Sequence, residues 1–190
     1  MASPVFHGLA GAGLAWASAG DGRLPPFAFL RKNWGLLLAG VGLACLPDVD
    51  YLPGLWRGYL NTTHQQATHS VAWVLLVCTG LWLAGRAWKP ERCGWRAAAF
   101  LLILVGSHLA IDLVTQDRLA PYGIPLGWPF LDGTWQAPWS WLPAWDKTAL
   151  ADLGSWRNLR ALAVELAAGS GLAAGCVWAK RGWTRRNAPL

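Results

Sequence analysis

The chain has 190 residues, of which 54% are hydrophobic and 14% are charged, and its formal net charge is +6. Average soluble domains carry about 25% charged residues, so this composition indicates a membrane protein. We expect a single domain over residues 1–190. The basic residues occur in short blocks rather than along a groove with aromatic partners, so no nucleic acid partner is expected.

Five apolar segments follow one another along the chain: residues 4–19, 34–46, 67–85, 97–115 and 161–179. A helix needs about 20 residues to cross roughly 30 Å of hydrocarbon, so the last three segments are long enough. The second is short. It either begins earlier, near Phe27, with Arg31 and Lys32 reaching the interface, or forms a re-entrant or interfacial helix. We therefore expect an all-α integral membrane helical bundle of about five transmembrane or partly re-entrant helices.

The distribution of Lys and Arg predicts how this bundle is oriented. Segments 20–33, 86–96 and 180–190 hold 11 of the 16 basic residues. With five spans, these three segments fall on the same side of the membrane. The positive-inside rule assigns that side to the cytoplasm and the N-terminus to the outside. We expect a multi-pass protein of a bacterial or archaeal cytoplasmic membrane.

The segment 116–158 is long for a loop and contains six tryptophans and five prolines. Indole rings favour the headgroup region, so we expect an interfacial cap over the outer end of the bundle. A plain aromatic belt without a role in substrate binding explains the composition equally well. The last span, 161–179, contains Gly171 and Gly175 in a GxxxG pattern, which predicts close packing inside the bundle rather than dimerisation.

Seven polar residues are candidates for one metal site at the outer face: His7, Asp48, Asp50, His64, His69, His108 and Asp112. They include every histidine of the chain, and the predicted topology places all seven at the same face. Ionisable side chains in spans are costly and are retained mainly where they pair or perform chemistry. The alternatives are histidines satisfied within the core and a polar cluster that ties helices together without metal.

The spacing of these residues gives local expectations. His108 and Asp112 are one helical turn apart and face the same side, where they share an ion or simply a hydrogen bond. Asp48 and Asp50 follow Pro47 in a non-helical start that turns both carboxylates toward one point. We expect His64 in a loop and His69 in the first turn of the third span. Thr68 and Ser70 are then available for capping or for bonds to the metal ligands.

Four imidazoles and three carboxylates suit zinc first, with manganese or iron as alternatives, better than calcium. Seven donors exceed the four positions of one tetrahedral zinc ion, so one or two ions fit the set. Such a site polarises an ester or phosphoryl oxygen. One carboxylate can act as general base instead of ligand, and Asp50 and Asp112 are the candidates.

The order of these motifs resembles the YdjM family of inner membrane proteins over residues 1–131. The motifs that carry the resemblance are His7, Pro47-Asp48-Val49-Asp50, His64-x4-His69-Ser70, Ser107-His108-x3-Asp112-x2-Thr115, Tyr122-Gly123 and Trp128-Pro129-Phe130. The resemblance implies a membrane-embedded metal-dependent hydrolase with the seven residues as its polar centre. The sequence departs from the family pattern at Gln65, where an arginine commonly stands, and at Gln116 to Ala120, which resembles an insertion.

We therefore expect a hydrolase that acts on an ester or phosphoester of a lipid or lipid-linked substrate arriving from the bilayer. The alternative is a metal-binding membrane protein without catalysis, such as a transporter, a sensor or a structural site. A transporter should place ionisable groups along a path across the bilayer, whereas here they gather at one face. Glu165, the remaining acid within a span, is expected to pair with Arg157 or Arg160.

Overall fold

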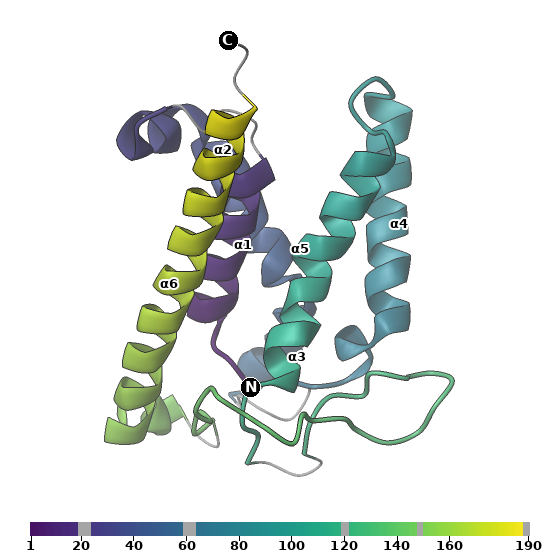
Figure 1. The fold of residues 1–190 in the computed structure, drawn as a ribbon. Coiled ribbons are helices and arrows are strands. Elements are labelled where there is room, and N and C mark those ends of the chain that lie inside the picture. Colours follow the sequence, from purple (N-terminus) through teal and green to yellow (C-terminus); the bar gives the residue numbers. More distant parts are fainter. Residues whose placement is uncertain (19–23, 59–63, 119–121, 148–149, 188–190) are drawn as a thin grey trace.

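The computed structural model describes residues 1–18, 24–58, 64–118, 122–147 and 150–187 (Figure 1). The α-helices in these ranges are α1 (Pro4–Ser18), α2 (Pro26–Ala44), α3 (Tyr51–Trp56), α4 (Val71–Trp88), α5 (Trp95–Leu113) and α6 (Trp156–Arg186). Short 3₁₀ helices are η1 (Leu46–Asp50), η2 (Ala67–His69) and η3 (Leu150–Gly154). The described residues form no named strand, which confirms the predicted all-α class.

The helices alternate in direction, so that the two chain termini lie at opposite ends of the molecule (Figure 1). The short helix α1 is central, because it packs against α2, α5 and α6. Helices α4 and α5 form an antiparallel hairpin beside this group, and α5 contacts α2. The beginning of α1, the end of α5, η1 and η2 consequently lie at one end of the bundle.

Three helices, α4, α5 and α6, are long and apolar enough to cross a membrane. A fourth span results if α2 and the following η1–α3 segment are one crossing bent by 59°. Helix α1 has 15 residues and is about 22 Å long, which is less than the hydrocarbon thickness. The predicted membrane bundle is confirmed, and the predicted number of about five helices is approximate. The predicted end of the first span at Ala19 lies outside the described residues.

The helix that contains the second apolar segment begins earlier than that segment, and it is compatible with either a bent span or a re-entrant segment. Helix α2 starts at Pro26, and the backbone at Asn33 is non-helical, with φ −120° and ψ 19°. The kink turns the first part of α2 sideways at the top of the bundle in Figure 1. This part carries Arg31 and Lys32, which allows their charges to stay at the interface.

Close packing in the bundle depends on glycines that the sequence pattern did not single out. A Cβ at Gly11 in α1 would lie 2.6 Å from the Cβ of Ala44 in α2 and nearer still to the carbonyl oxygen of Gly40. By contrast, nothing lies within 4 Å of a Cβ built at Gly171 or at Gly175. The prediction that this GxxxG pair packs inside the bundle is therefore wrong.

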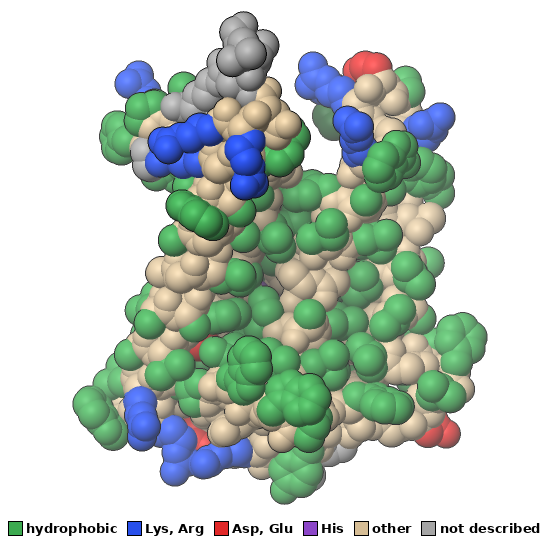
Figure 2. Space-filling model, in the orientation of Figure 1, with side chains coloured by type: hydrophobic (Ala, Val, Ile, Leu, Met, Phe, Trp, Pro, Cys, Tyr) green, Lys and Arg blue, Asp and Glu red, His purple; other side chains and the backbone are tan. Residues whose placement is uncertain are grey.

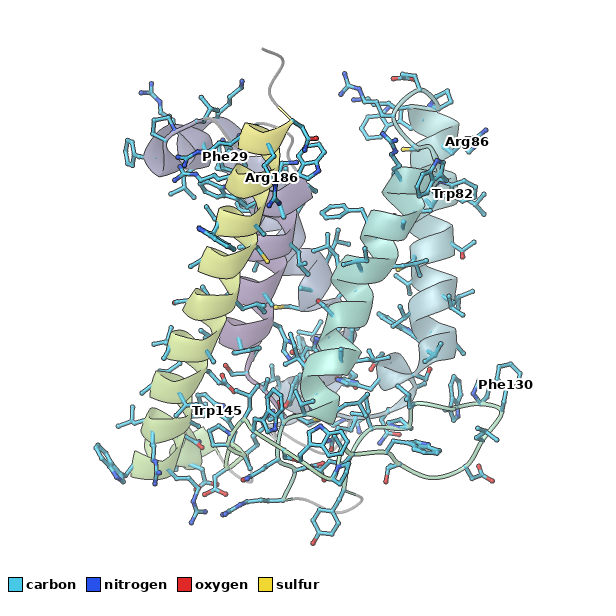
Figure 3. The ribbon with its side chains drawn as sticks, viewed as in Figure 1. Phe29, Trp82, Arg86, Phe130, Trp145 and Arg186 are labelled. Carbon is cyan, nitrogen blue, oxygen red and sulfur yellow. The ribbon has the colours of Figure 1, made fainter. Side chains whose placement is uncertain are left out.

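The two ends of the bundle differ in side-chain chemistry. Figure 2 shows one group of Lys and Arg at the end where α6 and α4 finish, hydrophobic side chains covering the helices below, and a second, smaller group of Lys and Arg at the opposite end, where α6 begins. Arg86 and Arg186 lie at this end in Figure 3, whereas Phe130 and Trp145 lie at the opposite end. There the Trp- and Pro-rich segment runs beneath the helices, although residues 119–121 and 148–149 of the predicted cap fall outside the described residues.

Candidate metal centre

The structure brings all seven predicted site residues together at the end opposite the basic one. They come from four separate parts of the chain: α1, the η1 helix, the segment that ends in η2, and α5. None of the seven side chains is more than 9% exposed. Ionisable groups buried to this extent need partners, and here they are one another's partners.

Local structure explains how each short segment presents its donors. His108 and Asp112 are one turn apart on α5, with His108 Nε2 3.1 Å from Asp112 Oδ2, as their spacing predicts. Asp48 and Asp50 lie in the 3₁₀ helix η1 rather than in a non-helical start, and both carboxylates still point into the cluster.

His69 lies in η2, before α4, rather than in the first turn of the third span as predicted. Helix α4 begins only at Val71, because Ser70 is its N-cap and accepts a hydrogen bond from the backbone N–H of Trp73. Thr68, as predicted, bonds to a neighbour of the site, donating from its hydroxyl to Asp50 Oδ2 at 2.7 Å. His64 precedes η2 in a loop, as predicted.

Four donor atoms form a compact group at the centre of the cluster. His108 Nε2 lies 3.1 Å from Asp112 Oδ2, 3.2 Å from His69 Nε2 and 3.5 Å from Asp48 Oδ1. His69 Nε2 lies 3.6 Å from Asp112 Oδ2 and 3.7 Å from Asp48 Oδ1. Ligand bonds of about 2.0–2.2 Å in a tetrahedral site separate ligand atoms by about 3.3–3.6 Å. These five distances are close to that spacing, so His69 and His108 together with either carboxylate fit the ligands of one divalent ion.

The tautomers of the two central histidines follow from their outer hydrogen bonds. His108 Nδ1 lies 2.8 Å from the carbonyl oxygen of Ala44, which only accepts, so this nitrogen carries the proton. His69 Nδ1 lies 3.0 Å from the Thr68 hydroxyl, which donates its own proton to Asp50 and therefore accepts from this nitrogen. In the neutral rings both Nε2 atoms then carry lone pairs that face each other and two carboxylates. A cation is needed between them, either a proton or a metal ion.

Several buried polar atoms of the cluster also lack a hydrogen-bond partner among the described residues. They are His7 Nδ1, His7 Nε2, Asp48 Oδ2, His64 Nε2 and Asp112 Oδ2. Buried donors and acceptors are normally satisfied, so this concentration of unsatisfied atoms in one cluster indicates a binding site. The donor set of imidazoles and carboxylates suits a transition metal.

The cluster of seven residues extends on both sides of the four central donor atoms. His7, His108 and Asp112 form one possible metal-holding triad, Asp48, His69 and His108 a second, and Asp50, His64 and His69 a third. In each triad one ligand atom per residue lies within 4.8 Å of the others. Because neighbouring triads share His108 or His69, the seven residues form a continuous row of donors rather than separate sites.

The electrostatic environment differs along this row. Burial lowers the pKa of His64 to about 4, which outweighs the opposing effect of Asp50, 2.8 Å from its Nδ1. Burial also opposes the charged form of His69, but hydrogen bonds with Asp48 and Asp50 outweigh it and raise the pKa of His69. His64 therefore favours its neutral form, and its ring stacks on Tyr51 with centroids 3.6 Å apart.

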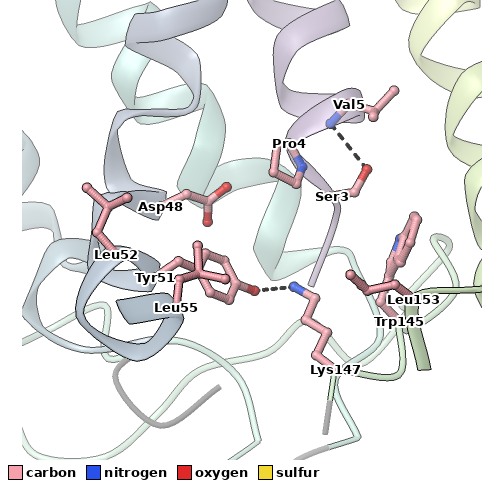
Figure 4. Close-up of a pocket in the computed structure, with 10 residues that line it drawn as sticks. All are labelled: Ser3, Pro4, Val5, Asp48, Tyr51, Leu52, Leu55, Trp145, Lys147 and Leu153. Carbon is pink, nitrogen blue, oxygen red and sulfur yellow. Dashed lines mark hydrogen bonds between the residues drawn. The ribbon is translucent and has the colours of Figure 1, made fainter. Parts of the chain in front are cut away.

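Sequence reasoning missed two residues beside the cluster, Tyr51 and Lys147 (Figure 4). The Lys147 ammonium donates a hydrogen bond to the Tyr51 hydroxyl, and both side chains line a cavity together with Asp48. Tyr51 follows Asp50 directly, and Lys147 is the one lysine between the fourth and fifth predicted spans. Neither sequence position identifies a site residue by itself, because Tyr51 and Lys147 come together only in the folded chain.

The expected partner of Glu165 is also wrong. Glu165 Oε1 accepts hydrogen bonds from the Ser3 N–H at 2.9 Å and from Trp145 Nε1 at 2.8 Å, and Oε2 accepts from the Ser3 hydroxyl. Arg157 instead pairs with Asp146 at 2.6 Å. Glu165 thus ties α6 to the start of α1 and to the Trp-rich segment.

The two departures from the family pattern meet in space. Gln65 has a positive φ of 63°, and its Nε2 donates to Asp117 Oδ2 at 2.7 Å. Asp117 lies in the five-residue stretch that resembles an insertion, and it also accepts from the Gly123 N–H at 3.0 Å. Residues 119–120 of that stretch lie outside the described residues. The Gln65 side chain therefore bonds to this stretch, and it does not direct a positive charge toward the cluster.

Comparison with known proteins supports the resemblance. The sequence profile of the family described as "YdjM inner membrane protein" matches residues 1–184. Inner membrane protein YbcI from Escherichia coli (strain K12) is 36% identical over 107 residues, which are 55% of this chain and 59% of that protein. The chain thus matches less than two thirds of this relative's length. No solved structure matches the chain.

Proposed function

The chain belongs to the YdjM family of inner membrane proteins, and we propose that it is a membrane-bound metal-dependent hydrolase. Its substrate is an ester or phosphoester of a lipid or lipid-linked molecule. The observation that carries this proposal is the placement of the His69 and His108 Nε2 atoms, each of which lies 3.1–3.7 Å from the other and from the carboxylate oxygens of Asp48 and Asp112.

We assign the ion to these four residues and name zinc first, with manganese and iron as alternatives, from the mixed nitrogen and oxygen donors. His7 and His64 flank the group, and a second ion would lie beside one of them. When bound, a divalent ion supplies Lewis acidity toward an ester or phosphoryl oxygen. The hydrogen bonds from the Nδ1 atoms of His69 and His108 orient the two rings, so that their Nε2 atoms would be available to hold the ion.

Of the two candidate general bases, the geometry favours Asp50. Asp112 Oδ1 accepts from the Ala2 N–H and lies 3.3 Å from His7 Nε2, and Oδ2 lies 3.1 Å from His108 Nε2 and 3.6 Å from His69 Nε2, within the central group of donor atoms. Asp50 instead orients His64 through its Nδ1, which leaves His64 Nε2 without a partner among the described residues. The Asp50–His64 pair can therefore accept a proton at His64 Nε2, while Asp112 serves as a ligand.

We further propose that the site faces the outside of the cytoplasmic membrane. The positive-inside rule supports this orientation, because the larger of the two groups of Lys and Arg lies at the opposite end of the bundle (Figure 2). A site sunk into this end, beside apolar helix surfaces, suits a substrate that reaches it from the bilayer.

One observation favours the non-catalytic alternative, in which the ion is structural. Structural zinc sites are closed by four protein ligands, whereas catalytic sites keep one position open. Binding by both histidines and both carboxylates would close such a shell, and catalysis would then need one carboxylate to remain outside it. Asp48 is the candidate, because among the seven residues it alone lines the neighbouring cavity.

Elemental analysis of the full-length protein, purified in detergent, tests the proposal. We expect one or two zinc, manganese or iron ions per chain in the native protein and in a Lys89→Gln control, and none in a His69→Ala, His108→Ala double variant. The metal-loaded native protein should hydrolyse 4-nitrophenyl dodecanoate or 4-nitrophenyl dodecyl phosphate. Native protein without metal after zinc, manganese and iron have been supplied would overturn the proposal. Metal without turnover would favour the structural alternative.

A further inference from the structure

A cavity of about 460 Å³ lies beside the candidate metal centre, between the start of α1, α3 and the segment that leads to α6 (Figure 4). Asp48 lines this cavity, and its Oδ1 atom also belongs to the group of donor atoms described above. Ser3 and Trp145, which Glu165 ties together, lie on the opposite wall. The cavity is therefore a route from the surface to the centre.

The remaining walls of the cavity are apolar and open to the surroundings. Leu52 is 61% exposed, Leu55 46% and Leu153 45%. Contiguous exposed apolar side chains of this kind are typical of membrane contacts and of ligand-binding grooves. The opening thus suits an acyl or alkyl chain that enters sideways from the bilayer.

One cation stands among the cavity residues, Lys147. Its ammonium donates to the Tyr51 hydroxyl and lies 5.0 Å from the centre of the Tyr51 ring. No carboxylate of the described residues lies within ion-pair distance of it. An ammonium has three donors, so Tyr51 leaves capacity for another acceptor. Burial lowers the pKa of Lys147, and an anion beside it would stabilise its charged form.

We propose that this cavity binds the substrate as a single-chain amphiphile with a phosphate-type anionic head. The head lies on Lys147 beside Asp48, and the chain runs along Leu52, Leu55 and Leu153. The assignment of this ligand as a substrate rests on the proposed function, whereas its binding does not. Lys147 is then the residue that selects an anionic head over a neutral one.

Binding of tritiated dodecylphosphonate, which cannot be hydrolysed as an ester, tests this inference on the full-length protein in dodecyl maltoside. We expect Lys147→Gln to weaken binding about tenfold or more, because a hydrogen bond between charged groups is lost. Lys147→Arg should retain most of the affinity. The matched control Lys89→Gln, at the opposite end of the bundle, should bind as the native protein does. Equal affinity of native and Lys147→Gln protein overturns the proposal.

Further binding and competition measurements identify the class of ligand without relying on one variant. Leu55→Gln should weaken both dodecylphosphonate and neutral dodecanol, whereas Lys147→Gln should leave dodecanol binding unchanged. Dodecyltrimethylammonium should compete less well than dodecylphosphonate on the native protein, and the reverse order contradicts an anion site. Inorganic phosphate that competes as well as dodecylphosphonate would overturn the amphiphile assignment. Lys147-dependent binding without hydrolysis of any ester would remove the proposed function and leave the cavity assignment standing.

Discussion

The two ends of the bundle use charged residues in opposite ways. At the basic end, cations lie against indole rings close to them in sequence, such as Lys89 over Trp88 at 4.8 Å and Arg96 over Trp95 at 5.7 Å. At the other end, histidines and aspartates from four parts of the chain meet and are buried. The first arrangement is local and exposed, and the second depends on the whole fold.

This difference predicts how each end tolerates change. A cation over an exposed aromatic ring contributes about 0.5–1 kcal/mol, and water replaces it readily. A buried charge that loses its partner has no such replacement, so its removal costs several times more. Substitutions should therefore have large effects at the end that carries the cluster and small effects at the basic end, and the following variants test that contrast.

The largest effect is expected for Asp112→Asn. This substitution keeps the shape of the side chain but removes the carboxylate that lies near His7, His69 and His108. Breaking a buried charged pair costs about 3–5 kcal/mol, and bound metal should be lost as well. Thermal unfolding in detergent and elemental analysis measure the two effects. A variant as stable and as metal-loaded as the native protein would show that Asp112 is neither a ligand nor a buried partner.

Much of this site was predictable because its signals are local. The one-turn spacing of His108 and Asp112 and the pair of acids after Pro47 are visible in the sequence, and the alternation of spans brings them to one face. The partners of the site were not predictable, because Lys147 meets Tyr51 across 96 positions of the chain and Glu165 meets Ser3 across 162.

The wrong predictions about the fold have a similar cause. Whether a glycine packs closely depends on which helix lies opposite, so the pattern at Gly171 and Gly175 predicted contacts that are instead made at Gly11 and Gly40. Likewise, Ser70 caps α4 and thereby leaves His69 two residues before the first residue of the helix. Helix boundaries of this precision depend on capping rather than on apolar periodicity.

A second variant tests whether the cluster depends on the fold above it. Gly11→Leu places a side chain where a Cβ alone already lies 2.6 Å from the Cβ of Ala44. Overpacking of this kind costs about 1–3 kcal/mol and should push α1, with His7, away from its neighbours. We expect reduced metal content although no site residue has changed.

The matched control for this variant is Gly35→Leu, because nothing lies within 4 Å of a Cβ at Gly35 in α2. It should leave both the metal content and the unfolding temperature close to native values. Equal metal loss in Gly11→Leu and Gly35→Leu would mean that the position of α1 does not control the cluster.

A smaller effect is expected at the helix cap beside the cluster. Ser70→Ala removes the hydroxyl that accepts from the Trp73 N–H at 3.2 Å and donates to the Ala67 carbonyl at 2.7 Å. Loss of an N-cap typically costs about 1 kcal/mol. Thr184→Ala, which removes a bond to the Lys180 carbonyl near the basic end, is the comparison, and it should cost less. Chemical unfolding in detergent can rank the two variants.

The smallest effect is expected at the basic end itself, for Lys89→Gln and Arg96→Gln. Each variant loses one cation lying over an indole, so stability should fall by less than about 1 kcal/mol, and salt should reduce the difference further. Metal content should not change, because neither charge belongs to the cluster.

Orientation in the membrane depends on the total positive charge at this end rather than on any single residue, so neutralising one residue should leave the orientation unchanged. Reporter fusions after Lys89 and after Trp145 should remain on opposite sides of the membrane in both variants. If a single neutralisation instead reverses the orientation or removes metal, the two ends are coupled, and the separation of orientation from chemistry drawn above fails.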